Sequence, residues 1–245
     1  MADKGVLIVV PARGGSKGLP RKNARSLGDL PLLGWTAEAV RAAALDSPAC
    51  ILSTDDEEIA AIGRSVGLDV PFMRPPALAT DEASAESVTL HALDWLASER
   101  GINPAAVMWL QPTSPFRNPE SLQQAMTMLV TSGCPGVIGV KPVYRSPKTL
   151  FNTNAQMDLV PLDAGVEAAN RRQALQPLYT PNGALYLVRT GTLRAGRSFF
   201  PLGARGIVMD QIASIDIDDP LDWSIASAIA TAGLTWRGGA IVHTT

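Results

Sequence analysis

The sequence predicts an α/β protein built on a mostly parallel, mixed sheet with helices on both faces. Short apolar runs alternate with segments of helical period along most of the chain, and this pattern is typical of parallel strands joined by crossover helices. Several of the apolar runs end in polar or glycine-rich loops. Because open α/β sheets bind ligands at the carboxyl ends of their strands, we expect a functional site at that edge.

The predicted elements follow one another in a regular order. The strands are short apolar runs bounded by polar residues, glycine or proline, and they cover Val6–Val10, Ala49–Ser53, Val107–Leu110, Gly136–Val140, Gly183–Val188, Ile207–Met209 and Ser214–Asp218. The helices have apolar residues at helical spacing, and they cover a segment carrying Leu33, Ala37, Val40 and Ala44 and the segments Glu57–Val66, Ser84–Glu99, Pro119–Thr131 and Leu221–Thr231. Polar residues at Thr54–Asp56 are suited to cap the second of these helices.

The segment from 141 to 176 interrupts this alternation. It is richer in proline, asparagine and glutamine than its surroundings and has no clear period. We therefore expect one main α/β domain formed by 1–140 and 177–232, an inserted arm formed by 141–176, and a weakly patterned tail at 233–245.

Composition and charge exclude several classes of protein. The 245 residues are 46% hydrophobic and 18% charged, which suits a packed core, and the net charge of −2 argues against a protein that grips nucleic acid. The run Val6–Val10 is shorter than the ~7–15 residues of a signal-peptide core or the ~20 of a membrane helix, so we expect a soluble, cytoplasmic protein with no membrane partner. Cys50 and Cys134 match no metal-binding spacing and are expected to be buried, reduced thiols.

The first strand leads into the segment Pro11–Asn23, which combines three glycines with a high density of positive charge. Glycine lets the backbone approach a ligand closely. Five cations fall within thirteen residues with no acidic residue between them, and they are Arg13, Lys17, Arg21, Lys22 and Arg25. In a chain of net negative charge, such a concentration indicates an anionic ligand rather than a turn with solvated cations, and a triphosphate fits.

Two familiar phosphate-binding motifs do not match this segment. A P-loop ends in Gly-Lys-Ser/Thr, whereas Gly18 is followed by Leu19. The dinucleotide fingerprint G-x-G-x-x-G requires a glycine where the chain has Arg13. A nicotinamide-dependent oxidoreductase is therefore disfavoured.

Six stretches of the chain, in their order along the sequence, resemble the acylneuraminate cytidylyltransferases (CMP-sialic acid synthetases), a family that includes legionaminic and pseudaminic acid cytidylyltransferases. They are Pro11–Asn23, Ser53–Asp56, Arg74-Pro75 with Leu78-Ala79 and Asp81, Leu110–Pro115, Asn182–Tyr186 and Ser214–Asp218. Each motif alone is weak, but the ordered set is specific. The resemblance extends over roughly residues 6–223.

The resemblance implies a Rossmann-like nucleotide-diphospho-sugar transferase fold, in which the main domain binds the nucleotide and the arm at 141–176 serves dimerisation. It implies a nucleotidyltransferase that moves CMP from CTP to the anomeric hydroxyl of a sialic-acid-like nonulosonate and releases pyrophosphate. Mg²⁺ is then the expected cofactor, CTP and an acidic sugar are the expected partners, and a homodimer is the expected assembly.

The expected site residues fall into three groups. Arg13 and Lys22 would bear on the α-phosphate of CTP, and the resemblance adds Arg172 as a third catalytic residue. The residues expected to bind the nucleotide are Arg13, Ser16, Lys17, Lys22, Asn23, Arg74, Asp81, Ser84 and Gln111. The residues expected on the sugar side are Gln111, Lys148, Arg172, Asn182, Tyr186, Phe199 and Phe200.

Asp216 and Asp218 are expected to hold the metal ion. Side chains alternate along a strand, so a strand over Ser214–Asp218 would place both carboxylates on one side. Two carboxylates beside phosphates form the kind of oxygen-rich site that Mg²⁺ prefers, and the resemblance to the family's metal motif favours this role over a solvated strand edge. Asp219 and Asp222 are instead expected to cap the helix that follows.

Two alternatives to this function stay open. A 3-deoxy-manno-octulosonate cytidylyltransferase shares the fold and a similar loop, although Gln111–Pro115 and Asn182–Ala184 favour the sialic type. A non-catalytic nucleotide-binding module would be expected to have lost the aspartates or the loop cations. The chain departs from the family's common pattern at Asp29 and Thr180, where members carry lysine and arginine, and the stretch 152–169 shows no motif. The sequence therefore does not identify the nonulosonate.

Overall fold

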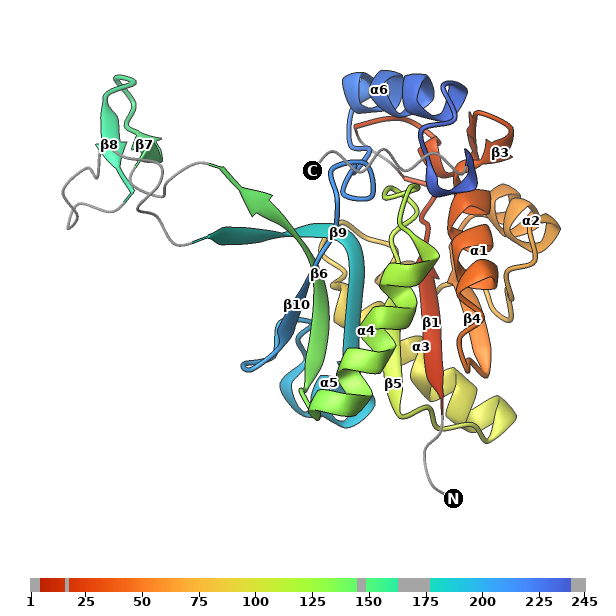
Figure 1. Cartoon of the computed structure of the whole chain (residues 1–245). Coiled ribbons are helices and arrows are strands. Elements are labelled where there is room, and N and C mark those ends of the chain that lie inside the picture. Colours follow the sequence, from red (N-terminus) through yellow and green to blue (C-terminus); the bar gives the residue numbers. More distant parts are fainter. Residues whose placement is uncertain (1–4, 16–17, 145–148, 163–176, 239–245) are drawn as a thin grey trace.

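A central six-stranded sheet forms the body of the protein (Figure 1). The computed structural model describes residues 5–15, 18–144, 149–162 and 177–238. In their order across the sheet, the strands are β10 (Arg205–Val208), β6 (Gly136–Val143), β9 (Leu178–Arg189), β5 (Ala106–Trp109), β1 (Val6–Pro11) and β4 (Ala49–Ser53). Strand β9 is antiparallel to both of its neighbours, and the other pairs are parallel. The predicted mostly parallel, mixed sheet is confirmed.

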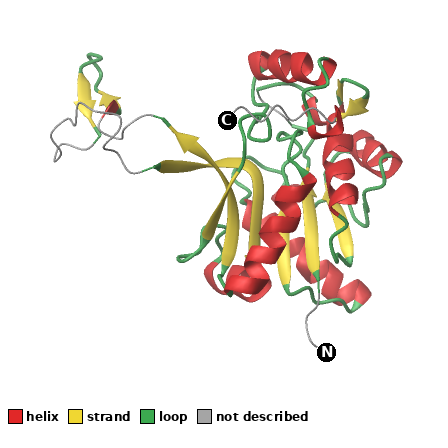
Figure 2. Cartoon of the chain, in the orientation of Figure 1, coloured by secondary structure: helices red, strands yellow, loops and turns green. Residues whose placement is uncertain are grey.

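Helices cover both faces of this sheet, as predicted (Figure 2). They are α1 (Leu32–Ala43), α2 (Glu57–Ser65), α3 (Ala85–Arg100), α4 (Pro119–Ser132), α5 (Thr190–Gly196) and α6 (Pro220–Thr231). Side chains of α1, α2 and α4 pack with Val6, Ile8 and Val10 of β1, whereas those of α3 and α5 pack with Leu7 and Val9. Because successive side chains of a strand point to opposite faces, a strand covered on both sides reads as one continuous apolar run.

The helix ends follow local capping chemistry. Asp56 caps α2 by accepting two backbone hydrogen bonds at 3.0 Å. Asp219 and Asp222 form a capping box at the start of α6, so the capping role expected for them is confirmed. Ala44 was expected on the apolar face of α1; it is instead exposed and ends the helix with a φ of 46°.

The segment Ser214–Asp218 is not a strand, and this prediction was wrong. A turn precedes it, in which Ser214 N–H donates to Asp210 O at 3.0 Å, and the segment itself is irregular. The alternating apolar residues Ile215 and Ile217 do pack inward, but they pack against the cluster around Trp35 and not within a sheet. The alternation of apolar and polar residues along Ser214–Asp218 therefore reflects alternating burial and not pairing with a neighbouring strand.

The inserted segment begins as an extension of the main sheet. β6 and β9 continue past the other strands as an antiparallel pair, with Lys141 opposite Thr180 and Val143 opposite Leu178. The expected domain boundary at 140 therefore falls inside β6, which ends at Val143. Beyond it, β7 (Phe151–Thr153) and β8 (Leu159–Pro161) form a hairpin that lies apart from the main body in Figure 1.

Short elements lie between the longer helices and strands or after the last of them. They are η1 (Lys22–Ala24), β2 (Ser26–Leu27), β3 (Leu30–Pro31), η2 (Pro76–Leu78) and η5 (Trp236–Gly238), and Figure 1 labels β3 beside α1. In η5, Arg237 forms ion pairs with Asp29 at 2.8 Å and with Glu38 at 2.7 Å, and its guanidinium lies 4.9 Å from the ring centroid of Trp35. The part of the tail up to residue 238 is therefore packed against the main domain, although its sequence pattern is weak.

Two properties expected from composition can be compared with the structure. Both cysteines are free: Cys134 is buried and Cys50 packs at the edge of the core, where burial raises the pKa of the Cys50 thiol to about 12. The expectation of a buried free thiol is confirmed for Cys134, whereas Cys50 is free but only partly buried. Within the described residues, no helix combines the length and apolarity needed to cross a membrane.

Candidate active site

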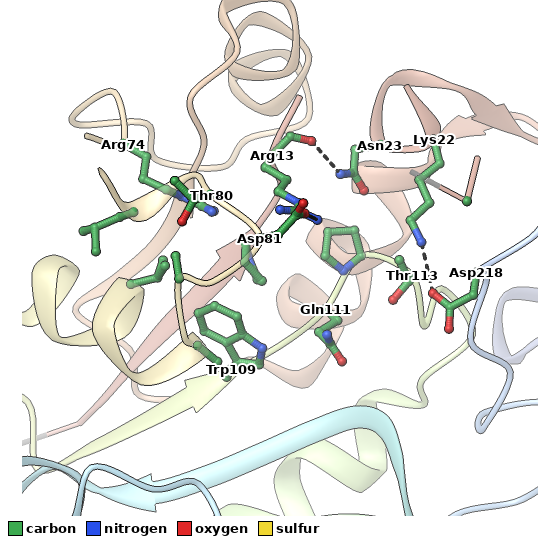
Figure 3. Close-up of a pocket in the computed structure, with 17 residues that line it drawn as sticks. Arg13, Lys22, Asn23, Arg74, Thr80, Asp81, Trp109, Gln111, Thr113 and Asp218 are labelled. Atoms are coloured by element: carbon green, nitrogen blue, oxygen red, sulfur yellow. Dashed lines mark hydrogen bonds and ion pairs between the residues drawn. The ribbon is translucent and has the colours of Figure 1, made fainter. Parts of the chain in front are cut away.

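A cavity of about 460 Å³ lies at the carboxyl ends of β1 and β5 (Figure 3). Its walls come from the loops that follow these two strands, from the segment between α2 and α3 together with the start of α3, and from the segment before α6. Of the residues expected to bind nucleotide, those that line it are Arg13, Lys22, Asn23, Arg74, Asp81 and Gln111. Asp218 joins them from a position 196 residues after Lys22. The fold thus brings together most of the nucleotide residues expected from the sequence.

The glycine-rich loop after β1 is packed closely against the aspartate segment. A Cβ atom at Gly18 would lie 2.2 Å from the carbonyl oxygen of Asp218, so only glycine fits there. Lys22 Nζ donates to Ile217 O at 2.6 Å and lies 3.2 Å from Asp218 Oδ1. These contacts place the lysine ammonium and the Asp218 carboxylate side by side at the cavity.

Arg13 and Asp81 meet inside the cavity, as Figure 3 shows. Arg13 Nη2 lies 2.7 Å from Asp81 Oδ1, and both side chains are partly exposed. Asn23 Nδ2 donates to Arg13 O at 3.4 Å, which links the two parts of the glycine-rich loop. Since an exposed ion pair of this kind is weak, the Arg13 guanidinium is available to an incoming anion.

Arg74 is held against the end of β4. Its side chain is buried, Nε donates to Ser53 Oγ at 3.0 Å, and a second guanidinium nitrogen donates to Ser53 O. Burial lowers the pKa of Arg74 to about 10, and the nearby Asp55 carboxylate opposes this change. The residue therefore stays cationic near neutral pH and is fixed in position at the cavity wall.

Asp216 has the features of a metal ligand without a metal. Its Oδ1 is buried and has no hydrogen-bond partner among the described residues. Burial raises the pKa of Asp216, hydrogen bonding with the Thr113 side chain opposes the rise, and the charge of Asp218 adds to it. A divalent cation would satisfy the oxygen and neutralise both carboxylates.

The two aspartates cannot form a complete metal site alone. Within the described part of the chain, no group of three or more histidine, cysteine, aspartate or glutamate side chains is arranged to hold a metal ion. Mg²⁺ is commonly held by one or two carboxylates together with substrate phosphates. The residues present therefore fit a magnesium ion that arrives with a nucleotide.

A second cavity, of about 550 Å³, is lined by both aspartates. Asp218 lines both cavities, and Asp216 lines only this one. The base of the arm contributes Lys141 and Tyr144, and α6 contributes Ile225. Asp218 thus lies where two cavities adjoin, and each is large enough for part of a substrate.

Most of the described residues expected on the sugar side lie outside the two cavities. Asn182 is buried, where Nδ2 donates to Ser214 Oγ at 2.9 Å and Oδ1 accepts from Ala184 N–H at 3.1 Å. Tyr186 packs between Phe199 and Phe200, with ring centroids 6.0 Å and 5.6 Å away. None of these four residues lines either cavity, whereas Gln111 lines the first.

Several expected residues are not at the cavities or not described. Ser84 caps α3 by accepting from Ser87 N–H at 3.1 Å, and it does not line the first cavity, although its neighbours Ala83 and Ala85 do. Four further expected residues lie outside the described residues, and they are Ser16, Lys17, Lys148 and Arg172.

The sequence reasoning did not single out four residues that shape the site. Trp109 and Thr113 line the first cavity, Lys141 lines the second, and Arg117 is buried behind the Gln111 loop. Trp109 lies near the end of the predicted strand Val107–Leu110, and Thr113 lies in the motif Leu110–Pro115. Their place in the sequence could therefore have indicated that they line the site. Nothing local distinguishes Arg117 or Lys141 from a surface cation.

Comparison with known proteins agrees with this geometry. A family model described as cytidylyltransferase matches residues 7–200. The chain is 32% identical to a CMP-N,N'-diacetyllegionaminic acid synthase from Legionella pneumophila, over 91% of this chain and 95% of that protein. It is also 32% identical to an N-acylneuraminate cytidylyltransferase from Escherichia coli, where the match covers 91% of this chain and 52% of the longer relative.

Solved structures share the fold at low sequence identity. One is a CMP:2-keto-3-deoxy-manno-octonic acid synthetase complexed with CTP, with a TM-score of 0.66 and 15% identity over 93% of this chain and 98% of that one. Another is a 4-diphosphocytidyl-2C-methyl-D-erythritol synthase from Anaerococcus prevotii, with a TM-score of 0.61 and 13% identity over 93% and 99%. They support the Rossmann-like fold expected from the motifs.

The family model and the full-length similarity to the Legionella relative lead to the same assignment. The family expected from the ordered motifs is confirmed, and with it the expectation of an enzyme of the nucleotidyltransferase class. The chain belongs to the cytidylyltransferase family.

Proposed function

We propose that this protein transfers CMP from CTP to the anomeric hydroxyl of a sialic-acid-like nonulosonate and releases pyrophosphate. The observation that carries the proposal is that Asp218 lines both a cavity with Arg13 and Lys22 in its wall and a second cavity that also contains Asp216 and Lys141. The names of the relatives, which refer to legionaminic acid and N-acylneuraminate, support an acidic nine-carbon sugar as acceptor.

The reaction requires the sugar oxygen to attack the α-phosphorus while the bond to pyrophosphate breaks on the opposite side. Arg13 and Lys22 would bind the triphosphate oxygens and stabilise the negative charge that develops there. Mg²⁺ held by Asp216 and Asp218 would neutralise phosphate charge and favour the ionised form of the attacking hydroxyl. Arg74, fixed to Ser53, would anchor the nucleotide at the far wall of the first cavity.

The second cavity is the place proposed for the acceptor sugar. Lys141 is the cation among the described residues that line it, and the others are acidic, uncharged polar or apolar. An acidic acceptor needs a cation to offset the repulsion of Asp216 and Asp218. Lys148 and Arg172, expected on the sugar side from the resemblance, stay predictions.

The assembly and the location in the cell are also proposals. The arm carries several exposed apolar side chains, among them Tyr144, Phe151 and Leu159, and exposed apolar side chains concentrated in one segment are typical of an interface. We infer a homodimer formed through the arm, and a cytoplasmic enzyme that meets CTP and free sugar there. Light scattering coupled to size-exclusion chromatography tests the dimer, and a monomeric mass would contradict it.

The test of the function is pyrophosphate release from CTP and Mg²⁺ with a panel of acceptors. The panel contains N-acetylneuraminate, legionaminate, pseudaminate and 3-deoxy-manno-octulosonate. We expect release with one nine-carbon acid and its loss when EDTA removes the metal. Release with the octulosonate alone would assign the eight-carbon alternative, and CTP binding without release for any acceptor would favour a non-catalytic nucleotide-binding module.

A further inference from the structure

Arg117 is a fully buried arginine immediately behind the site. It lies between Phe116 and the start of α4, and none of its side chain is exposed. Burial lowers the pKa of Arg117 to about 9, while the charge of Asp216 acts in the opposite direction. The guanidinium is therefore protonated at neutral pH. Placing a charge in a protein interior costs free energy, so its retention calls for an explanation.

The guanidinium binds three segments that are distant in sequence. Nε donates to Ala184 O of β9 at 2.9 Å, Nη1 donates to Thr36 Oγ1 of α1 at 2.7 Å, and Nη2 donates to Gln111 O in the loop after β5. Thr36 is itself fully buried. No described carboxylate forms an ion pair with Arg117, so its charge is compensated only by oxygen dipoles and by more distant groups.

Two of the three hydrogen bonds, those to Ala184 O and Gln111 O, fix the backbone next to or within the site. Gln111 lines the nucleotide cavity. Gly183, which precedes Ala184, has a φ of +81°, and a Cβ there would lie 2.8 Å from Asp216 Oδ2 and 3.4 Å from Gln111 Oε1. The side chains of Gln111 and Asp216 therefore converge over Gly183, and Arg117 holds the backbone on both sides of that point.

The same loop also holds the aspartate segment. Ile217 N–H donates to Thr113 O at 2.8 Å, and Ile217 lies between the two proposed metal ligands. A shift of the Gln111–Pro115 loop would therefore move Gln111 and the aspartates together. Because Arg117 binds this loop at Gln111 O, its position affects both.

We propose that Arg117 is a positioning residue for the transfer reaction, and this role rests on the proposed function. Its planar fork joins the Gln111 loop, β9 at Ala184 and α1 at Thr36, and so keeps Gln111 and Asp216 in the arrangement that the reaction needs. It lines neither cavity, and we assign it no contact with substrate. Lysine would keep the charge but has one nitrogen, which cannot serve three separated acceptors as the guanidinium does.

This role predicts a particular split between binding and turnover. The cations proposed to bind CTP are Arg13, Lys22 and Arg74. Their partners in the structure are Asp81, Ile217, Asp218 and Ser53, none of which accepts a hydrogen bond from Arg117. Loss of Arg117 should therefore leave CTP affinity nearly unchanged. Since a displacement of about 1 Å at reacting groups can cost ~100-fold in rate, kcat should fall by about that factor.

Arg189 offers a matched control. It is the last residue of β9, is half-buried, and also binds backbone carbonyl groups, with Nε donating to Cys134 O at 2.9 Å and Nη2 to Leu129 O at 2.8 Å. It lines neither the first nor the second cavity. Its replacement removes comparable hydrogen bonds but leaves the Gln111 loop intact.

The experiment compares Arg117→Lys and Arg117→Met with Arg189→Lys and Arg189→Met. Thermal unfolding, CTP affinity by calorimetry, and kcat and KM for pyrophosphate release are measured for each. We expect both Arg117 variants to lose about 100-fold in kcat with CTP affinity retained, and lysine to restore little. The Arg189 variants should lose thermal stability without loss of kcat. A wild-type kcat in Arg117→Lys and Arg117→Met would overturn the proposal, as would an equal loss of kcat in the Arg189 variants.

A milder variant covers the case in which the Arg117 variants do not fold. Thr36→Val keeps the arginine and nearly the same volume but withdraws one of its three acceptors. A lower kcat with unchanged CTP affinity supports the positioning role, and an unchanged kcat contradicts it. The activity of the wild-type protein separates the two proposals. If the wild-type protein turns over no acceptor, the proposed function fails, and the role of Arg117 fails with it. If the wild-type protein and the Arg117 and Thr36 variants are equally active, only the role of Arg117 is ruled out.

Discussion

Lys22 and Asp218 lie 3.2 Å apart, although 196 residues separate them in the sequence. The same ammonium donates to Ile217 O at 2.6 Å. The loop proposed to bind phosphate and the segment proposed to bind metal are therefore joined by one side chain. Because a cation bonded to the aspartate segment also faces the cavity, Lys22 affects both the charge at the phosphates and the position of Asp218.

We expect Lys22→Met to lower kcat/KM for CTP by about 100- to 1,000-fold, the size of effect seen when one charge-stabilising donor is removed. The variant should also change the Mg²⁺ concentration needed for half-maximal activity, because the Lys22 ammonium both contacts Asp218 and repels a cation bound there. Steady-state kinetics at several Mg²⁺ concentrations measures both effects. Arg25→Met is the control. Arg25 belongs to the same cationic run, but it does not line the first cavity, and its guanidinium lies 5.8 Å from the ring centroid of Trp223. Equal losses in the two variants would show that only the total charge of the loop matters.

Replacing Asp216 by Asn should abolish turnover and leave the fold as stable as before, or more stable. Burial raises the pKa of Asp216, which means that its charge is unfavourable in the metal-free folded protein. An uncharged residue of the same size removes that penalty together with the proposed metal ligand. Pyrophosphate release and thermal unfolding in metal-free buffer are the measurements.

Asp69→Asn provides the comparison for this variant. Asp69 is a partly exposed carboxylate that lies 2.6 Å from Arg100, and it lines neither cavity. We expect it to retain full activity. If Asp216→Asn releases pyrophosphate at the wild-type rate, the metal assignment is wrong.

The parts of the fold and site that the sequence predicted are those with a local signal. The apolar run of β1 and the glycines and cations of the following loop each lie within a few consecutive residues, so composition alone revealed them. Asp56 and Asp219 gave correct helix starts because capping depends on the next three residues. The cavity then follows from topology, since the loops after parallel strands meet at one edge of the sheet.

The parts that were missed depend on contacts between distant segments. Arg117 reads as a surface cation until Thr36, Gln111 and Ala184 are brought around it. Asn182, which is expected on the sugar side, uses its amide Nδ2 to donate to Ser214 Oγ, a contact that the sequence does not reveal. The strand expected over Ser214–Asp218 failed for a similar reason, because a single backbone bond to Thr113, and no neighbouring strand, holds Ile217.

Replacing Arg74 by Lys should make CTP binding depend on pH. Arginine keeps its proton despite burial, which lowers the pKa of Arg74 only to about 10, so wild-type affinity should be flat from neutral to mildly alkaline pH. A buried lysine loses its proton more readily, so the affinity of the variant should fall as the pH rises. Calorimetric titration with CTP measures this, and Arg100→Lys, a partly exposed ion-paired arginine, should show no such trend. A flat profile for Arg74→Lys would contradict a charge-based role in nucleotide binding.

Arg237→Ala should lower the melting temperature without changing kcat, because Arg237 joins the tail to Asp29 and Glu38 and packs on Trp35, away from both cavities. Its hydrogen bonds with Asp29 lower the pKa of that carboxyl. A carboxyl whose pKa is lower in the folded protein stabilises the fold above its unfolded pKa and stops doing so as the pH falls through the folded value. The difference in melting temperature between wild type and variant should therefore be present at neutral pH and shrink below about pH 4. Arg205→Ala is the control, because Arg205 is at an exposed position of β10 and has no ion pair within the described residues. It should shift the melting temperature little at either pH. If the difference for Arg237→Ala persists in acid, stacking on Trp35 and not the ion pairs holds the tail.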